Sequence, residues 1–467
     1  MLIYWIRNDF RFKDNEAFYY FFNKKENKKC VYSYDDDKFK NRSAQKWWLY
    51  KTLCNYKINL EEKKIKFDFI LNNEIDAINY ILKKHSIKEI VWNKIFLPKE
   101  IIIENKIINI LKKKNISFKV FSSNLLLDPL KTRKKDNTPF QVFTPFWKNE
   151  EKLYIENHQY KNLPLKNNKN LKFKDFKEFE VILPNKKWFK KFEKYWNVGE
   201  NEAQKKISEF KKIKINKYDT DRDIPSIDGT SKLSPHLAFG EISSRDIFDQ
   251  YLSIPKKNLG TRKYINEIGW REFAYHLINH FPQIEQSNLR KNFDNFPWSQ
   301  NKTHLKKWKL GETGYPIVDA AMRQLYETGW MHNRLRMVTG SFLVKHLRIN
   351  WIEGEKYFKD TLLDYDTANN VAGWQWIAGC GADAAPYFRI FNPMTQGEKF
   401  DADGNFVKKW IPGLKNVPKK FIHKPWELSG DISQKINFDL KRDYFEPIVD
   451  HVKARIEALK AFEFTKK

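Results

Sequence analysis

The sequence contains little cysteine and no long apolar run. Its three cysteines, Cys30, Cys54 and Cys380, are too far apart for the paired spacing of a zinc or iron–sulfur site. We therefore expect no metal centre and a reducing, cytoplasmic environment. No apolar stretch is long enough to cross a bilayer, and residues 1–12 lack the apolar core and cleavage site of a signal peptide. These absences predict a cytoplasmic protein with no membrane partner.

Common catalytic and nucleotide-binding motifs are also missing. No GxGxxG follows the first apolar run and no GxxxxGK(S/T) occurs, which excludes the usual dinucleotide and P-loop sites. The sequence likewise lacks the GxSxG turn of serine hydrolases and the HExxH of zinc proteases. A nucleotide, if one is bound, must be held in another way.

The chain carries a large excess of positive charge. Its 86 lysine and arginine residues outnumber its 58 aspartate and glutamate residues, which gives a net charge of +28 over 467 residues. A polyanion such as nucleic acid is the natural partner of such a chain. Coding bias is the alternative, because lysine, asparagine and isoleucine are all frequent. Aromatic residues make up 16% of the chain, which favours a ligand that stacks on rings.

Residues 1–125 alternate between short apolar runs and amphipathic runs. The apolar runs predict strands at residues 2–6, 29–34, 66–71, 88–92 and 116–121. Helices are expected between them, at residues 15–23, 43–61, 74–84 and 98–114. This alternation predicts a doubly wound, Rossmann-like α/β domain with a five-stranded parallel sheet. A nucleotide site in it would lie at the carboxyl ends of the strands.

The pattern changes after this first domain. Residues 126–200 are rich in lysine and asparagine and predict a surface connector, with one ordered aromatic turn at 138–147. Helical periodicity begins near residue 201, and strand patterns disappear. Helices are expected at residues 201–210, 243–252, 264–279, 317–328, 333–348 and 353–363. We therefore expect an α/β domain (1–125), a connector (126–200) and an all-α domain (201–467).

The most informative stretch of the helical half is residues 364–394. It combines two acids, two amides and two tryptophans: Asp364, Asp366, Asn369, Asn370, Trp374 and Trp376. A tightly turned core segment would explain the tryptophans, but it would not need the acids and amides. We expect instead a bound polar ring, which these polar groups would orient.

Residues 229–234 have the composition of a phosphate site. They directly precede an expected helix and offer hydroxyls and free backbone N–H groups, which bind phosphate well at a helix start. An ordinary N-cap by Thr230 or Ser231 is the alternative, and it is the commoner case for such a sequence.

Two other groups in the helical half contain the residue types of a binding site. Glu267 and Trp270 share a helix face, where the indole would partly desolvate the carboxyl; a solvated helix acid is the alternative. The second group could contact both a polar ring and a phosphate, and it consists of Asn333, Arg334, Arg336 and Met337. His332, next to this group, is expected to be structural.

Five runs of the sequence resemble the photolyase/cryptochrome flavoproteins, and most of all a bacterial class I photolyase of cyclobutane pyrimidine dimers. They are WIRNDFRFKDN (5–15), GTSKLSPHLAFGEIS (229–243), NEIGWREF (266–273), GETGYPIVDAAMRQLYETGWMHNRLRM (311–337) and WQWIAGCGADAAPYFRIFNPMTQGEKFD (374–401). The resemblance spans almost the whole chain and is weak only at residues 36–65 and in the connector. It implies an all-α FAD-binding domain that holds FAD noncovalently in a U shape.

The resemblance also implies which residues bind the cofactor. Those matching the diphosphate and ribityl region are Tyr218, Thr230, Ser231, Lys232, Leu233, Ser234 and Arg271. Those matching the surroundings of the isoalloxazine are Asn333, Arg336, Asp364, Asp366 and Asn370. Asn370 would face flavin N5, and Arg336 would form a buried pair with Asp364, costly to break from one side.

Further positions match residues that act in catalysis and on the substrate. Trp298, Trp351 and Trp374 match a relay that carries an electron from the surface to the flavin, although each alone could be core packing. Residues that match the pocket for a flipped pyrimidine dimer are Glu267, Trp270, Met337 and Trp376. Residues that match contacts to the DNA backbone are Arg222, Arg334 and Arg389.

The implied activity is light-driven repair of UV-damaged DNA. Reduced FADH⁻ would absorb light and pass an electron to the dimer, whose two inter-base bonds would split before the electron returns. A protonated Glu267 would donate a hydrogen bond to the dimer carbonyls and so stabilise the added charge. A damaged base stacks poorly, so flipping it costs less than flipping a normal base.

Three rival functions remain to be separated from this one. A (6-4) photolyase would carry a His-His pair where this chain has His332 and Asn333. A cryptochrome-type blue-light sensor would tend to have an acid at Asn370 and a long tail, whereas this chain ends at Lys467. A basic nucleic-acid-binding protein without catalysis would leave the tryptophans and the acid–amide group unused.

The resemblance leaves the antenna chromophore of the first domain open. Folate and deazaflavin are both found in this family, and the sequence does not identify either. We further expect a monomer that acts on UV-damaged DNA.

Overall fold

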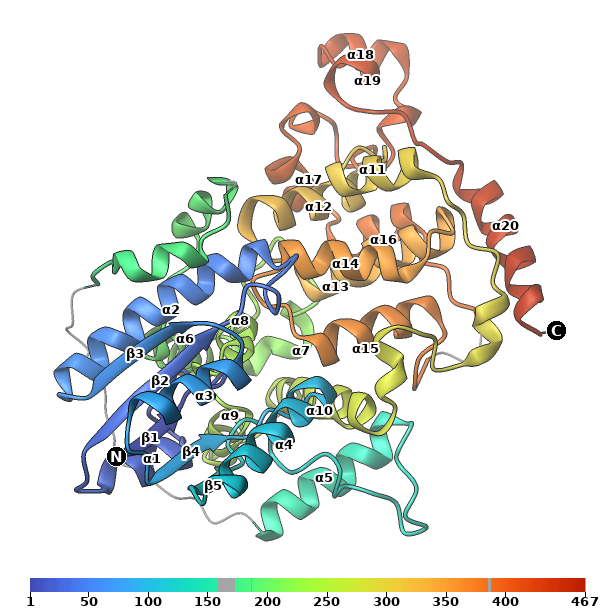
Figure 1. Cartoon of the computed structure of the whole chain (residues 1–467). Helices are drawn as coiled ribbons and strands as arrows, with labels where there is room; N and C mark the ends of the chain where they lie inside the picture. Colours follow the sequence, from blue (N-terminus) through green and yellow to red (C-terminus); the bar gives the residue numbers. More distant parts are fainter. Residues whose placement is uncertain (158–172, 186, 385–387, 467) are drawn as a thin grey trace. The chain divides into compact units, whose positions relative to one another are not determined.

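The computed structural model describes residues 1–157, 173–185, 187–384 and 388–466. These residues form two compact units (Figure 1). Unit 1 consists of Met1–Asn216, Ser231–Pro282 and Leu363–Ala368, and unit 2 of Lys217–Thr230, Gln283–Leu362 and Asn369–Lys467. Part of the expected connector (158–172) and residues 385–387 of the acid–amide stretch lie outside the described residues. The expected domain limits at residues 125 and 200 stay predictions.

Unit 1 contains the predicted five-stranded parallel sheet. Its strands are β1 (Leu2–Trp5), β2 (Lys28–Tyr34), β3 (Lys66–Leu71), β4 (Glu89–Asn93) and β5 (Ser117–Phe121). The spatial order is β3-β2-β1-β4-β5, and every neighbouring pair is parallel. The predicted strand positions are confirmed to within one or two residues. Strands are added from β1 towards β3 on one side and then from β4 to β5 on the other, so the order of connection switches between β1 and β4. Doubly wound sheets bind ligands at this switch point.

Helices follow the strands and cover both faces of the sheet. They are α1 (Glu16–Asn23), α2 (Ser43–Glu62), α3 (Glu74–Lys84) and α4 (Pro98–Lys113). One face packs on α3 and α4, which lie side by side, through a core that includes Trp5, Trp92 and Ile107 (Figure 1). On the other face, Tyr4 packs against Phe18 of α1. Alternate residues of each strand thus point to opposite faces, as strand geometry requires.

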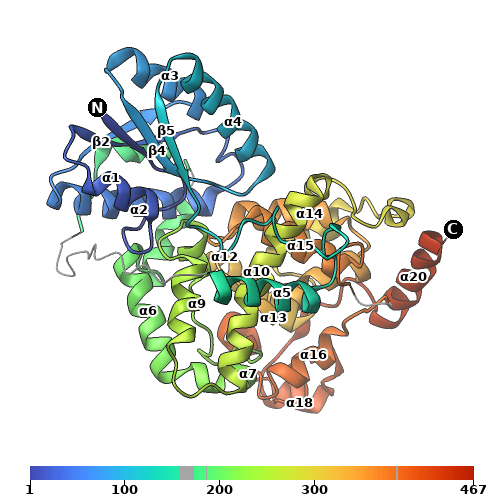
Figure 2. The ribbon, with the colours of Figure 1, turned by 90° about the horizontal axis from the view of Figure 1, so that it is seen from below.

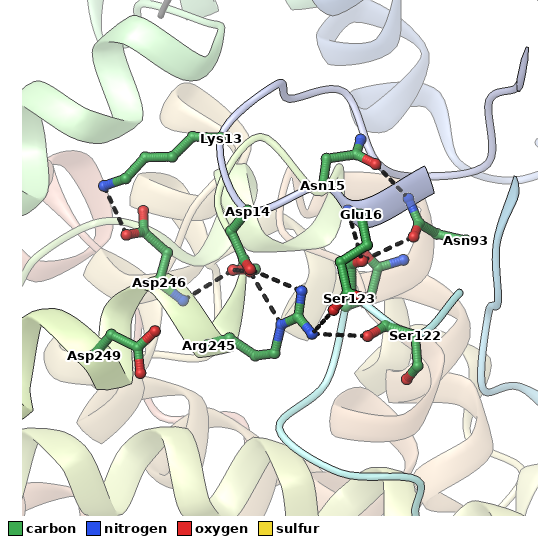
Figure 3. A network of polar contacts seen from close by, with 12 residues as sticks. Lys13, Asp14, Asn15, Glu16, Asn93, Ser122, Ser123, Arg245, Asp246 and Asp249 are labelled. Atoms are coloured by element: carbon green, nitrogen blue, oxygen red, sulfur yellow. Dashed lines mark hydrogen bonds and ion pairs between the residues drawn. The ribbon is translucent and has the colours of Figure 1, made fainter. Parts of the chain in front are cut away.

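The loop after β1 is held by charged side chains from distant parts of unit 1 (Figure 3). Arg245, on α9 (Ser244–Leu252), lies 2.7 Å from Asp14 and 2.8 Å from Glu16, and it also donates to the Ser122 carbonyl. Asp14 has a positive φ of 49° and accepts a second hydrogen bond from Ser243 at 2.5 Å. The loop is therefore fixed by α9 and by the segment after β5.

The remaining helices of unit 1 include one that the sequence did not predict. They are α5 (Phe143–Asn157), α6 (Glu200–Ile213), α8 (Ser234–Ala238), α9 and α10 (Leu259–His280). Helix α5 begins inside the expected aromatic turn, so the prediction of a connector without helix was wrong there. Both α5 and α9 lie against α10 (Figure 2). The long α10 carries the motif at residues 266–273.

Unit 2 is helical throughout its described part. Its helices are α7 (Tyr218–Asp221), α11 (Lys302–Leu310), α12 (Pro316–Thr328), α13 (Asn333–Ser341), α14 (Trp351–Thr361), most of α15 (Thr367–Ala378), α16 (Pro393–Phe400), α17 (Asn405–Trp410), α18 (Gly430–Lys435), α19 (Leu440–Asp443) and α20 (His451–Glu463). A π-helix, Phe342–His346, follows α13 and interrupts the single helix that we expected there. Among the described residues, no helix is long and apolar enough to span a membrane.

Candidate functional site

Helix α2 contacts the segment of unit 1 that carries Asp364 and Asp366, the two acids of the acid–amide stretch. The amide of Gln45 donates to the carbonyl of Tyr365 at 2.7 Å and to that of Leu363 at 3.4 Å. The guanidinium of Arg42 lies 4.9 Å from the centre of the Tyr365 ring. These contacts fix the backbone on both sides of Asp364, which is itself buried.

Two predicted cofactor residues of unit 1, Arg271 and Asp366, contact the same residue, Tyr275. The hydroxyl of Tyr275 donates to Asp366 at 2.6 Å, and the guanidinium of Arg271 lies 4.9 Å from the Tyr275 ring centre. Arg271 also donates to Ser244 at 2.8 Å and pairs with Glu272 at 3.2 Å. A guanidinium and a carboxylate on one scaffold can bind phosphate and hydroxyl groups of the same ligand.

These residues border a small cavity of about 50 Å³ at the carboxyl ends of the strands. Asn8 after β1, Lys38 after β2, Phe96 after β4 and Asn124 after β5 line it together with Arg271, Tyr275 and Asp366. The Nε of Arg42, also in the lining, is buried and has no hydrogen-bond partner among the described residues. The cavity thus lies where the sequence predicted a nucleotide site in the first domain.

The segment before α8 contains the residues expected to bind phosphate. Its N-cap is Leu233, with no side-chain hydrogen bond, so the N-cap role considered for Thr230 or Ser231 was wrong. Lys232 has a positive φ of 51°, and Ser231 hydrogen-bonds Tyr264. Ser234 is the first residue of α8 and is exposed.

Thr230 belongs to unit 2 and follows a close turn. At Gly229, an added Cβ would lie 2.7 Å from the Cβ of Asp221, so only glycine fits there. Tyr218, at the start of α7, is buried, and the guanidinium of Arg222 lies 5.2 Å from its ring centre.

Helix α10 presents Trp270 as an aromatic platform on unit 1. The ring of Trp270 stacks on Phe143 of α5 at 3.8 Å and is nevertheless 37% exposed, so its other face is available. The lack of a side chain at Gly269 allows Trp147 of α5 to pack closely against α10, because an added Cβ there would lie 2.5 Å from Trp147. The Trp147 indole donates to Asn266 at 3.0 Å. Glu267, one turn before Trp270, is half-buried.

Unit 2 brings two of the predicted DNA-binding arginines together. Arg334 lies 2.9 Å and Arg222 3.8 Å from the same carboxylate, that of Asp223. His332 is the N-cap of α13, and its ring nitrogen accepts the backbone N–H of Arg334. Burial lowers the pKa of His332 to about 4, which keeps the ring neutral and able to accept. The expectation of a structural histidine is confirmed.

The other predicted residues of α13 follow on the same helix. Asn333 is exposed, Met337 is half-buried, and the Nε of Arg336 donates to the Met331 carbonyl at 2.9 Å. The expected pair of Arg336 with Asp364 would join unit 2 to unit 1, and it stays a prediction.

The three tryptophans of the expected relay lie along connected segments of unit 2. Ser299 forms a backbone bridge with Ile349, which brings the segments of Trp298 and Trp351 side by side. Trp374 lies against α14, the helix that Trp351 begins, because an added Cβ at Gly354 would be 2.1 Å from its ring. Trp298 is half-buried, whereas Trp351 and Trp374 are almost completely buried. Trp298 is therefore the one member of the series that reaches the surface.

The start of α15 within unit 2 offers polar groups and open space. Asn370 donates to the Glu355 side chain at 3.2 Å and to its carbonyl at 3.4 Å. The indole N–H of Trp374 is buried and has no hydrogen-bond partner in the described part of the chain. At Gly373, an added Cβ would meet nothing within 4 Å. Residues 370, 373 and 374 share a helix face, so the amide, the open position and the indole lie close together.

Trp376 and Arg389, the last two predicted substrate residues, both line a cavity of about 430 Å³ in unit 2. The Trp376 indole donates to the Asp383 carbonyl at 3.1 Å, and Arg389 is exposed.

Sequence reasoning missed several residues of these sites. Tyr275 was recognisable in principle, since it lies one turn after Arg271 on the same helix. Trp308 packs edge-on against Trp374, with ring centres 6.3 Å apart, but no spacing in the sequence indicates this contact. Gln45 and Lys38 come from the part of the first domain that carries the weakest resemblance.

Comparisons with known proteins cover both units. A family model described as DNA photolyase matches residues 2–165, and one described as FAD binding domain of DNA photolyase matches residues 264–464. The deoxyribodipyrimidine photo-lyase of Agrobacterium fabrum is 37% identical over 475 residues, which is 100% of this chain and 98% of that protein. The enzyme of Escherichia coli is 47% identical, over 58% of this chain and 57% of its own.

Solved structures agree with these matches. A bacterial class III photolyase from Agrobacterium tumefaciens superposes with a TM-score of 0.92 at 37% identity, over 100% of this chain and 97% of its own. A cryptochrome from Synechocystis has a TM-score of 0.88 at 27% identity, over 99% of each chain.

Proposed function

Because this chain belongs to the photolyase/cryptochrome family, we propose that it repairs cyclobutane pyrimidine dimers in DNA in a light-dependent reaction. It is a deoxyribodipyrimidine photo-lyase, a carbon–carbon lyase that splits the dimer into two pyrimidines. The observation that carries this proposal is the 37% identity to such an enzyme over the whole of both chains.

The chain's FAD-binding domain has residues that fit the cofactor. Arg271, Tyr275 and Asp366 of unit 1 would hold phosphate and hydroxyl groups, and residues 231–234 would bind the diphosphate. On unit 2, Asn370 and Trp374 lie near Gly373 on α15, and the Trp374 indole N–H has no hydrogen-bond partner among the described residues. FAD, when bound, supplies the absorption of light and the electron that splits the dimer.

The tryptophan series of unit 2 would keep the cofactor in its reduced, active state. Trp298 is accessible to a reductant in solution, and Trp351 and Trp374 are shielded from water. An indole can be oxidised by one electron, so three in sequence divide one long transfer into shorter steps. Replacement of Trp351 by phenylalanine should stop photoreduction while leaving flavin binding intact.

The substrate side combines an aromatic platform with cations. Trp270 presents one free face on which a flipped base can stack, and Glu267 on the same helix would donate a hydrogen bond to the dimer. Arg222, Arg334 and Arg389 would neutralise DNA phosphates, with Asp223 holding the first two in place. Met337 and Trp376, on unit 2, are the other two residues that we propose to contact the dimer.

An antenna chromophore would bind at the strand ends of unit 1, where the small cavity would have to widen to admit it. The side chains there that the FAD site does not use include the ring of Phe96 and the cations Lys38 and Arg42. A photolyase from Sulfolobus tokodaii, 25% identical, contains two FAD molecules, one of them implicated in light harvesting. Folate, deazaflavin and a second flavin are therefore the candidates, and mass spectrometry of the released chromophores would distinguish them.

The decisive experiment follows repair directly. The purified protein is photoreduced and illuminated with UV-damaged oligo(dT), and the recovery of thymine absorbance is measured against a dark control. Recovery under light alone is expected. A bound, photoreducible flavin without recovery would refute dimer repair and favour a (6-4) enzyme or a light sensor. A protein without flavin would refute the proposal altogether.

Three finer assignments belong to this proposal. The bacterial class I assignment stays a prediction, since a full-length structural match is described as class III. A cytoplasmic location is supported by the three cysteines, all of which are free and buried. A monomer bound to damaged DNA is the expected working form, which light scattering of the complex would test.

A further inference from the structure

The cavity of about 430 Å³ in unit 2 has a role that dimer repair alone does not require. We call it the Lys345 cavity. Its walls come from four parts of unit 2: Arg290 to Phe293, Ser341 and Lys345, residues of the ranges 376–379 and 388–391, and Phe462 to Lys466. Its volume falls within the ~300–1,000 Å³ range of small-molecule sites.

Lys345 is an unusual residue to find in such a wall. It belongs to the π-helix and is only 2% exposed. Its ammonium lies 3.4 Å from the ring centre of Phe388. Burial lowers its pKa to about 7, and the neighbouring Cys380 keeps a neutral thiol because burial raises its pKa to about 12. In the part of the chain that the structure describes, no carboxylate pairs with Lys345.

The charged side chains of the described lining are all cationic. They are Arg290, Lys345, Arg389 and Lys466, and no acidic residue is among the described residues that line the cavity. A buried cation without a counter-charge is costly, and an anionic ligand would remove that cost. Short π-helical segments such as the one that carries Lys345 occur frequently at functional sites.

Aromatic rings make up most of the rest of the lining. They are Phe293, Trp376, Phe388, Phe391 and Phe462. Phe388 and Phe462 stack at 4.5 Å with an angle of 8° between their planes. A ligand that matches both the cations and the rings must be flat, aromatic and anionic. A nucleotide has these properties, because every base has a π-face and every unit of a strand has a phosphate.

We propose that the Lys345 cavity binds a single unpaired nucleotide, with its base among the phenylalanine rings and its phosphate on Lys345 and Arg389. The nucleotide would be a unit of the damaged DNA other than the dimer, or a free mononucleotide. The first source rests on the proposed function, since Trp376 and Arg389 are also the predicted lesion and backbone contacts. Repair would then depend on two neighbouring nucleotide sites in unit 2.

The test measures binding in darkness, so that no repair occurs. The full-length protein and its Lys345→Met variant are titrated with a labelled duplex carrying one dimer, and fluorescence anisotropy gives Kd. The nucleotides around the dimer, on both strands, are then replaced one at a time by an abasic sugar. Lys409→Met is the matched control, because Lys409 also lies over an aromatic ring, that of Trp410, but is exposed and outside the cavity.

We expect one position at which loss of the base weakens binding by about tenfold in the unaltered protein and in Lys409→Met, but not in Lys345→Met. Thymidine 5′-monophosphate, titrated by calorimetry, tests the second source, and its binding should be lost in Lys345→Met. Phe462→Leu, which removes one ring of the stacked pair, provides the same comparison if Lys345→Met does not fold.

The proposal is overturned if no abasic position distinguishes the variants and the mononucleotide binds them equally or not at all. Light-driven repair by the unaltered protein is measured in parallel. If the effect of the abasic position depends on Lys345 but no repair occurs, the proposed enzymatic function is refuted and the nucleotide site is supported. If repair occurs but the abasic effect does not depend on Lys345, the nucleotide site is refuted and the enzymatic function is supported.

Discussion

Replacing Gly354 with alanine should displace the buried indole of Trp374. Gly354 lies one turn after Trp351 on α14, and an added Cβ would be 2.1 Å from Cη2 and 2.6 Å from two other ring carbons of Trp374. The ring has little room to retreat, because Phe358 and Trp308 pack on it with centres 5.0 Å and 6.3 Å away. Either the ring or the helix must therefore move.

The expected loss of stability follows from two opposing effects. Overpacking of a filled core costs about 1–3 kcal/mol, and replacing a helical glycine by alanine returns about 0.5–1 kcal/mol. The variant should thus lose about 1–2 kcal/mol in the free energy of unfolding. Photoreduction of the flavin should slow as well, because the proposed relay has Trp374 as the member next to the flavin.

Urea unfolding and light-induced bleaching of the flavin absorbance would measure the two effects on the same sample. Gly430→Ala is the control, since an added Cβ at Gly430 would meet nothing within 4 Å. A Gly354→Ala variant that is as stable as this control and photoreduces at the unaltered rate would refute both the packing and the proposed relay.

Three other perturbations test separate features. Arg245→Met should lower the free energy of unfolding by about 3 kcal/mol, because it leaves Asp14 without its buried partner. In the same urea assay, Arg348→Met should lower this free energy by less than about 1 kcal/mol, because it removes only an exposed ion pair. Burial raises the pKa of Glu150 to about 8 from an ordinary 4.5, so the folded protein binds a proton that the unfolded chain releases. The free energy of unfolding should therefore fall as the pH rises from 4.5 to 8, and it should fall less in Glu150→Gln. Parallel plots of unfolding free energy against pH for the two proteins would contradict this. Asp223→Asn should strengthen binding to undamaged duplex and steepen its salt dependence, because the acid no longer competes with phosphate for its arginines; an unchanged slope in a salt titration would show that they do not contact DNA.

The fold was largely readable from the sequence, because its first domain repeats a strong local pattern. Strands and helices alternate with clear changes of hydrophobic period, and all five strands lie where that pattern placed them. Helix α5 was missed although its buried residues recur at helical spacing, because Pro145 in its first turn favours a turn when it is considered without the residues that follow. The π-helix was missed because no local preference distinguishes it from a continued α13.

The sites were harder to predict than the fold. Motif resemblance indicated the residues that touch a cofactor or a substrate, since these are residue types with specific chemistry. It could not indicate a residue that positions them from far away, such as Gln45, because contacts between segments far apart in sequence leave no periodic signal. Phe143, the partner of Trp270, lies in a stretch that was expected to contain only a turn.

The ion pair of Arg245 with Asp14 also determines when the loop after β1 can be fixed during synthesis. These residues are 231 positions apart, and the same arginine reaches the carbonyl of Ser122. At roughly 5–20 residues per second, a ribosome needs about 10–45 s to add the arginine after the aspartate has been made. The sheet can form in that interval, but the loop after β1 must wait for α9. A nascent chain stalled before α9 should therefore expose this loop to proteases, although all five strands have already been translated.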